Sequence, residues 1–299
     1  MDYRAERIIA EEFQKFLMSG VLYLGSKPVM WSPIEKTALA EAEVEYHDKE
    51  SFTVWVKFRV VGHTKKEAEK IVRRADALYG KEDSGSKAER IESVESDPLN
   101  LRNAFVVIWT TTPWTIPSNK AVVFGEDISY GLYEVTETPE ECWAEVGEKY
   151  IVADNRADDM MSRARLEPSM YRRVGDVPTH RLAGLTLLHP LANAEGSKGE
   201  WDDPRDFRAA DFVSDEEGTG FVHCAPSHGM EEYELYRGLG MLDRVITYNV
   251  LDDGSFRPDL PFFGGKRILR AKPKNGDWEG DANKAVIDKL VEMGGLLAR

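Results

Sequence analysis

The stretch VVIWTTTPWTIPSNKAVVF, from Val106 to Phe124, joins a hydrophobic run to three consecutive threonines and then to a second hydrophobic run. Apolar and β-branched residues on both sides predict two short strands. The two prolines restrict the backbone between them, and on an extended chain Thr110 and Thr112 point to one side while Thr111 points to the other. Each hydroxyl can donate one hydrogen bond and accept two, so the cluster could bind a polar substrate or position a water. A threonine-rich strand end without a function is the alternative.

Further strands are predicted on both sides of this stretch. The clearest is SFTVWVKFRVV, from Ser51 to Val61, where apolar and polar residues alternate. One face of that strand would carry Phe52, Val54, Val56, Phe58 and Val60, and the other Thr53, Lys57 and Arg59. Short apolar runs separated by Gly, Pro, Asp and Asn predict strands near residues 104–109, 120–124, 130–135, 149–153, 206–213 and 220–224. This spacing is typical of a barrel or a sandwich.

Helices are predicted around these strands. An amphipathic helix is indicated within residues 1–24, stopping at Gly20, and others near residues 156–166, 228–239 and 281–293. The segment 62–100 is charged and poor in large apolar groups, which predicts an exposed, partly mobile insertion. The expected fold is a β-rich mixed α+β domain with a β-barrel-like core and peripheral helices.

A second unusual stretch is EEGTGFVHCAPSHGMEEYELY, from Glu216 to Tyr236. A glycine-flanked strand delivers His223, which could act as a base or hold a water, or could be a hydrogen-bonded core histidine. Glu232 falls in the first turn of the helix that follows, where negative charge is favourable, and it could receive an ammonium group if it faces a pocket. Ser227 and Cys224 lie close to histidines in sequence. Neither is predicted to be a nucleophile, because neighbouring strand residues face opposite ways and no G-x-S-x-G turn is present.

Composition narrows the function. The chain has 299 residues, 42% hydrophobic, which is enough for a sizeable core. A formal charge of −14 argues against a generic grip on nucleic-acid phosphates, so any such contact should be local. No apolar run is long enough for a membrane span, and two cysteines form neither a disulfide framework nor a metal-spaced cluster. These features predict a cytoplasmic protein without metal or cofactor.

The two stretches together resemble one family. WTTTPWTIPSN and GTGFVHCAPSHG are similar to the paired signatures of the editing insertion in isoleucyl-tRNA synthetases, and the segments KPVMWSPIEKTALAEAEVEY, VLDDGSF and DANKAVIDKL extend the likeness. The related valyl and leucyl editing domains carry an arginine in the threonine stretch, whereas this chain has Thr112-Pro113-Trp114. Signatures like HIGH and KMSKS, which amino-acid activation requires, are absent from the sequence. The resemblance therefore implies that residues 1–299 are a single editing domain excised from a larger synthetase.

The resemblance also implies a function and a site. The domain would hydrolyse the ester of valine wrongly attached to isoleucine tRNA, using no cofactor. Its partners would be the valine-carrying acceptor end of that tRNA and the remainder of the synthetase. The implied catalytic residues are Thr110, Thr111, Thr112 and His223, and the implied substrate-binding residues are Trp114, Asn119 and Glu232. Backbone N–H groups between Thr111 and Pro117 are candidates to stabilise the oxyanion.

One departure and two alternatives accompany this interpretation. The family typically has an aspartate where this chain has Glu232, so the anchoring of the substrate's α-ammonium by that residue is in doubt. A different class of function is a binding module that holds the aminoacylated tRNA end without turning it over. An unrelated esterase or amidase using Ser227 or Cys224 is the third alternative.

Overall fold

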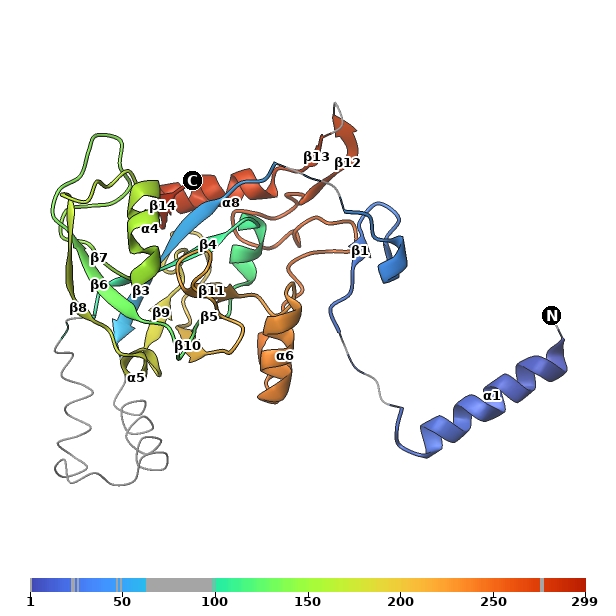
Figure 1. Cartoon of the computed structure of the whole chain (residues 1–299). Coiled ribbons are helices and arrows are strands. Elements are labelled where there is room, and N and C mark those ends of the chain that lie inside the picture. Colours follow the sequence, from blue (N-terminus) through green and yellow to red (C-terminus); the bar gives the residue numbers. More distant parts are fainter. Residues whose placement is uncertain are drawn as a thin grey trace, which may run out of the picture.

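A computed structural model describes residues 2–22, 25, 27–46, 48, 50–62, 99, 101–274 and 277–299. The insertion predicted at residues 62–100 lies, apart from residues 62 and 99, outside the described residues. Figure 1 shows a central sheet with helices around it and the N-terminal helix α1 (Tyr3–Met18) apart from the sheet. The candidate residues of both sequence stretches lie within the described part.

The centre of the molecule is a ten-stranded mixed sheet in the order β11-β5-β10-β9-β3-β4-β7-β6-β8, with β14 also pairing β3. The β10–β5 and β4–β7 pairs are parallel, and the other pairs are antiparallel. The strands are β3 (Val54–Gly62), β4 (Phe105–Thr110), β5 (Ala121–Phe124), β6 (Tyr130–Val135), β7 (Lys149–Ala153), β8 (Tyr171–Asp176), β9 (Thr186–Leu188), β10 (Arg205–Ala209), β11 (Phe221–Cys224) and β14 (Leu296–Ala298).

Helices and two small hairpins surround this sheet. The helices after α1 are α4 (Ala157–Arg163), α5 (Thr179–Leu182), α6 (Met230–Gly238), α7 (Leu242–Val245) and α8 (Ala282–Glu292). Short 3-10 helices are η1 (Glu41–Glu43), η2 (Pro113–Ser118) and η3 (Asp154–Arg156). The hairpins pair β1 (Trp31–Ser32) with β2 (Thr37–Ala38) and β12 (Leu269–Lys274) with β13 (Asp277–Glu279).

The predicted β-rich core with peripheral helices is confirmed. Among the described strands, the hydrogen-bonded ladder runs from β11 to β8 without closing on itself. The sheet nevertheless curls, as a hydrogen bond between two distant parts of it shows. Thr219, just before β11, donates from Oγ1 to the carbonyl of Val107 on β4 over 2.6 Å. The carbonyl of Thr219 also accepts from the N–H of Ala153 at the end of β7 over 3.0 Å. One edge of the sheet therefore comes back against its middle, as in a barrel that stays open.

Strand β3 departs from the alternation read in its sequence. Lys57, predicted on a polar face, is 4% exposed, while Phe52 lies before the strand and is 43% exposed. One face of β3 is covered by the main core, and the first half of the other face by a second apolar cluster that includes Trp55, while Arg59 and Val61 farther along that face are exposed. The Lys57 ammonium is compensated there by an ion pair with Glu148, with Nζ 2.8 Å from Oε1. Burial of a charge in this way requires such a partner.

The amphipathic helix predicted at the N-terminus is confirmed as α1, which has no buried residue. Its apolar side chains, including Ile9, Phe13 and Phe16, are more than half exposed. In the part of the chain that the structure describes, no helix is both long and apolar enough to cross a membrane.

Candidate functional site

Two adjoining features of the fold bring the two sequence stretches together. Strand β4 ends at Thr110, and the chain then turns through η2 into β5. Strand β11 pairs antiparallel with β5, and His223 lies opposite Val122 in that register. The imidazole of His223 thereby reaches the turn between β4 and β5. The site is thus built by a strand end, a rigid turn and the neighbouring strand.

A hydrogen-bond network joins the threonine stretch to His223. The Thr112 N–H donates to Thr110 Oγ1 over 3.1 Å, and the two hydroxyl oxygens lie 3.2 Å apart. Thr115 donates from Oγ1 to the Thr112 carbonyl over 2.9 Å, and its oxygen lies 2.9 Å from Nε2 of His223. Thr110 and Thr115 are buried, whereas Thr111 and Thr112 are exposed. The two exposed hydroxyls are therefore the ones that a substrate or water can reach.

The hydrogen bonds of His223 define which of its ring nitrogens carries a proton. Thr115 has one hydroxyl proton, which the Thr112 carbonyl takes, so its oxygen must accept from His223 Nε2–H. The other ring nitrogen, Nδ1, lies 3.4 Å from the Asn119 amide nitrogen, which can only donate. Burial and, secondarily, the nearby His228 lower the pKa of His223 to about 4. His223 is therefore a neutral Nε2–H tautomer with both nitrogens engaged, which disfavours a role as general base in this state.

Asn119 carries an acceptor that has no partner. Its amide nitrogen donates to the carbonyl of Ala121 over 2.7 Å, which fixes the orientation of the amide. The amide oxygen, Oδ1, is buried, and among the described residues it has no hydrogen-bond partner. An unsatisfied buried acceptor is costly unless a ligand or water supplies a donor. Asn119 is thus suited to receive a hydroxyl or an N–H group from a bound molecule.

The η2 turn is held rigidly by side chains from four distant segments. His189 Nε2 donates to the Ile116 carbonyl over 2.9 Å, and Trp201 Nε1 donates to the Pro117 carbonyl over 3.0 Å. Asn249 donates to the Pro117 carbonyl over 3.3 Å, and Asn283 Oδ1 accepts from the Trp114 N–H over 2.9 Å. Fixing a site in this way keeps its groups in position before a substrate arrives.

Hydrogen bonds within the turn exclude three of the backbone donors that the sequence predicts between Thr111 and Pro117. The N–H groups of Thr112, Trp114 and Thr115 already donate to Thr110 Oγ1, Asn283 Oδ1 and the Thr112 carbonyl, respectively. These three donors were candidates for oxyanion stabilisation and are committed to the internal structure of the turn. A backbone oxyanion site built from them is therefore excluded in this conformation.

The indole ring of Trp114, in η2, packs against the imidazole of His228. Their ring centroids are 4.8 Å apart in an edge-to-face arrangement. His228 Nε2 is 3.2 Å from the hydroxyl oxygen of Ser118, and burial lowers the pKa of His228 to about 4. Both rings line a cavity of about 540 Å³ between η2, α6 and the segment around Trp31. The predicted wall residue Trp114 thus borders a real cavity.

Glu232 lies in the first turn of α6 with its carboxylate folded back over Gly229. A Cβ atom at Gly229 would lie 1.6 Å from Oε2 of Glu232. Burial raises the pKa of Glu232, opposed by a hydrogen bond from its own backbone N–H. Its charge, together with the larger effect of burial, raises the pKa of the Cys224 thiol. The structure thus holds Glu232 at the start of a helix, a favourable place for a carboxylate, rather than among the threonines.

The two alternative nucleophiles are poorly placed. Cys224 is fully buried, and its raised pKa disfavours the reactive thiolate. The Ser227 oxygen accepts from the Thr247 N–H over 2.7 Å and lies 3.1 Å from the Thr247 hydroxyl. Neither side chain is hydrogen-bonded to a histidine among the described contacts, so the arrangement does not support covalent catalysis.

Thr115 and the ring of residues that holds η2 were not singled out from the sequence. Thr115 lies in the same quoted stretch, but on an irregular turn its direction cannot be read from strand alternation. His189, Trp201, Asn249 and Asn283 come from distant segments that show no local pattern. Only the polar character of His189 between apolar neighbours was a visible signal, and such a residue is as often structural.

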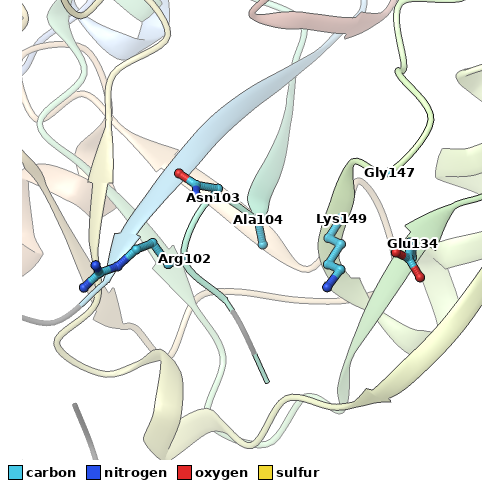
Figure 2. A pocket seen from close by; sticks show the side chains of 6 residues that line it. All are labelled: Arg102, Asn103, Ala104, Glu134, Gly147 and Lys149. Carbon is cyan, nitrogen blue, oxygen red and sulfur yellow. The ribbon is translucent and has the colours of Figure 1, made fainter. Parts of the chain in front are cut away.

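A second hollow lies at the opposite end of β4, with a volume of about 310 Å³. Figure 2 shows Lys149 and Glu134 on adjacent strands, with Arg102 on the other side of Ala104. Arg172 donates from Nε to Glu134 over 2.8 Å, and this hydrogen bond lowers the pKa of Glu134. The hollow is open and polar and contains none of the predicted site residues.

Comparison with known proteins places the chain in a class. A profile of the family described as tRNA synthetases class I (I, L, M and V) matches residues 1–251. The match covers most of the chain, which therefore belongs to the class I tRNA synthetase family.

Individual relatives are more specific. The chain is 67% identical over its whole length to the isoleucine–tRNA ligase of Ruegeria pomeroyi. It is 41% identical to that of Caulobacter vibrioides and 42% identical to that of Mesorhizobium japonicum, in both cases again over its whole length. The chain spans 27%, 27% and 29% of these three relatives, respectively, or a little over a quarter of their length.

Solved structures give a weaker comparison. The editing domain of the cytosolic leucyl-tRNA synthetase of P. falciparum matches with a TM-score of 0.41 and 12% identity, covering 79% of each chain. A structure titled GlLeuRS-CP1 matches with a TM-score of 0.39 and 14% identity, covering 64% of this chain and 62% of that one. Both scores lie below the level at which a shared fold can be argued.

Proposed function

We propose that residues 1–299 form the editing module of an isoleucyl-tRNA synthetase, which hydrolyses valine from mischarged isoleucine tRNA. The observation that carries the proposal is the network of Thr110, Thr112, Thr115 and His223 beside the unpartnered oxygen of Asn119. The 67% identity to an isoleucine–tRNA ligase supports the choice of synthetase. The assignment of valine and of the tRNA end as substrates rests on the resemblance of the two sequence stretches to the family.

The proposed chemistry is water attack on the ester carbonyl. The exposed hydroxyls of Thr111 and Thr112 orient the water and the ester, while the buried network keeps their backbone fixed. Water adds to the carbonyl carbon, the ester C–O bond breaks, and a proton from the water passes to the departing ribose oxygen, so that valine and a free ribose hydroxyl are released. Because His223 is neutral and engaged on both nitrogens, it positions Thr115 and Asn119 rather than accepting the proton. The adjacent ribose hydroxyl of the tRNA would then assist this proton transfer.

Asn119 and Trp114 take the binding roles in this proposal. The unpartnered Oδ1 of Asn119 is buried, so it accepts a hydrogen bond from the terminal ribose or the substrate amine only when a local movement opens a path to it. Trp114 follows the threonines in the chain and lines the cavity of about 540 Å³, so it would limit the space for the amino-acid side chain. Glu232 can anchor the ammonium group only by leaving its position over Gly229.

The test is hydrolysis of valyl-tRNA(Ile) compared with isoleucyl-tRNA(Ile) by the purified chain at high protein concentration. We expect faster loss of valine. Equal loss of both amino acids would support the hydrolase activity and contradict the specificity for valine. Loss of neither ester would contradict the proposal for this chain.

A binding module is the second candidate, favoured by one observation. The group expected to act as base, His223, has no free nitrogen, and the expected anchor, Glu232, is turned toward its own helix. A module of this kind would bind uncleaved valyl-tRNA(Ile) and protect its ester from spontaneous hydrolysis. Protection rather than cleavage in the same assay would select this candidate.

A further inference from the structure

The cavity of about 540 Å³ next to Trp114, here named the Trp31 cavity, is lined by groups that the proposed reaction does not use. Its walls include Lys27, Trp31, His228 and Tyr248, besides Trp114. A volume of this size is in the range of small-ligand sites. The cavity adjoins the threonine stretch because Trp114 belongs to both. Trp114 is the wall residue that the cavity shares with that stretch, since none of Thr110, Thr111 and Thr112 lines the cavity.

Two aromatic side chains in the wall of the Trp31 cavity are exposed to solvent, and a hydrogen bond holds one of them in place. Trp31 is 42% exposed and Tyr248 is 78% exposed. The indole N–H of Trp31 donates to the carbonyl of Asp252 over 2.8 Å, which holds the ring in place. Exposed aromatic rings at fixed positions are the surfaces on which unpaired bases stack, with little dependence on base identity.

His228 gives the cavity one defined polar group. Arg257 Nε donates to Asn249 Oδ1 over 2.9 Å, so the Asn249 amide nitrogen faces Ser118 and donates to its oxygen over 3.2 Å. Ser118 is 1% exposed, and its own proton needs an acceptor, which His228 Nε2 supplies at 3.2 Å. The neutral imidazole of His228 then carries its proton on Nδ1. The cavity is thus lined by a histidine whose tautomer the protein sets.

We propose that the Trp31 cavity binds a nucleobase of the single-stranded RNA that leads to the esterified terminal nucleotide. Three observations on the described residues support this ligand class: exposed aromatic rings, of which Trp31 is held by a hydrogen bond, the imidazole of His228 with its proton on Nδ1, and a lysine, Lys27, in the wall. Membership of a tRNA synthetase family supplies the RNA end. The inference rests on the proposed function, because it extends the substrate of that same site by one nucleotide or more.

The experiment compares binding of the RNA trinucleotide CpCpA and of adenosine to the chain and to Trp31→Ala, by calorimetry. The matched control is Trp278→Ala, because Trp278 is also 42% exposed but does not line the cavity. We expect Trp31→Ala to weaken CpCpA binding about tenfold, the effect of losing one base–aromatic stack. Adenosine affinity should stay within about twofold, since a terminal nucleoside does not reach Trp31. Tyr248→Ala is a second variant at a highly exposed position, for which we expect the same direction of change.

The possible outcomes separate this inference from the function on which it rests. Unchanged CpCpA affinity in Trp31→Ala, equal weakening by Trp278→Ala, or no CpCpA binding at millimolar concentration would overturn the nucleobase site. Specific weakening by Trp31→Ala in a chain that cleaves no ester would support the nucleobase site and contradict the hydrolase. Ester cleavage with unchanged CpCpA binding in Trp31→Ala would keep the hydrolase and remove the nucleobase site.

Discussion

Strand β4 has two very different ends. At Thr110 its polar groups are enclosed: Thr115, Asn119 and His223 are each less than 9% exposed and bound to one another. At Phe105 the strand begins beside the open hollow of Figure 2, where Glu134 pairs with the exposed Arg172. Both ends are polar, so residue type does not distinguish them. Burial does, because an enclosed polar group must find its partner inside the protein, whereas a solvated one can use water.

The comparison predicts that substitutions at the enclosed end have large, specific effects. The largest is expected for the double variant Thr111→Ala/His223→Ala. It removes an exposed hydroxyl that orients the water and the imidazole that holds Thr115 and Asn119. We expect hydrolysis of valyl-tRNA(Ile) to fall at least about a thousandfold, equal to about 4 kcal/mol of activation free energy. Single-turnover rates measure this, with circular dichroism to check folding. Retained activity in a folded variant would remove these residues from the site.

The second prediction concerns pH. The folded protein holds the pKa of His223 and of His228 near 4, compared with 6.5 for a free histidine. Between those values the unfolded chain binds more protons, so stability from these groups is complete above about pH 6.5 and is lost as pH falls toward 4. For His223 alone the loss from pH 7 to pH 5 is about 2 kcal/mol. Urea unfolding at both pH values measures it. His223→Gln should show a smaller loss than the unaltered chain, and an equal loss would contradict the assignment.

The third prediction isolates one hydroxyl. Thr115→Val keeps the size of the side chain but leaves His223 Nε2–H without a partner and removes one of the two donors to the Thr112 carbonyl, which still accepts from the Thr115 backbone N–H. We expect a loss of about 1.5 kcal/mol in the free energy of unfolding and a change in the His223 nitrogen resonances. Thr115→Ser, which keeps the hydroxyl, is the control and should retain the Nε2–H tautomer in the NMR spectrum. If valine and serine behave alike, the hydroxyl does not position His223.

The smallest effect is expected at the open end of β4. Lys149→Ala removes a charge from the hollow of Figure 2 without leaving an enclosed partner. We expect a change within about 0.5 kcal/mol in stability and within about twofold in hydrolysis. Thermal unfolding and the deacylation assay measure both. A large loss of activity here would show that the open end takes part in function and would break the contrast between the ends.

Much of the fold could be predicted from the sequence because most strands are short apolar runs between turn residues. Some strands lack such a pattern and cannot be predicted in this way. Tyr171–Asp176 forms the edge strand β8, where exposed arginines hide any apolar pattern, and β9 is three residues long. On β3, alternation predicted one solvated face, but a second apolar cluster covers the first half of it. That cluster is assembled from distant segments, which local periodicity cannot reveal.

The candidate site divides in the same way. The threonines, Asn119 and His223 could be named because they lie in two unusual stretches, and the fold brings those stretches together. Their roles remain proposals. The partners that fix them, above all Thr115 and His189, depend on an irregular turn and on contacts across the sheet. The position of Glu232 over Gly229 is likewise a matter of side-chain conformation, which the sequence pattern does not determine.

The buried thiol of Cys224 allows the local opening of the structure next to His223 to be measured. Cys224 follows His223 directly on β11, is fully buried and packs with Tyr236 and Val245, so an alkylating reagent can reach it only when the structure around this end of β11 opens. Its labelling rate, read by mass spectrometry, would report the free energy of that opening without any RNA present. Cys142, which is only partly buried, would be labelled sooner and serve as an internal reference. The rigidity of the strand that carries His223 can thus be measured before its chemistry is known.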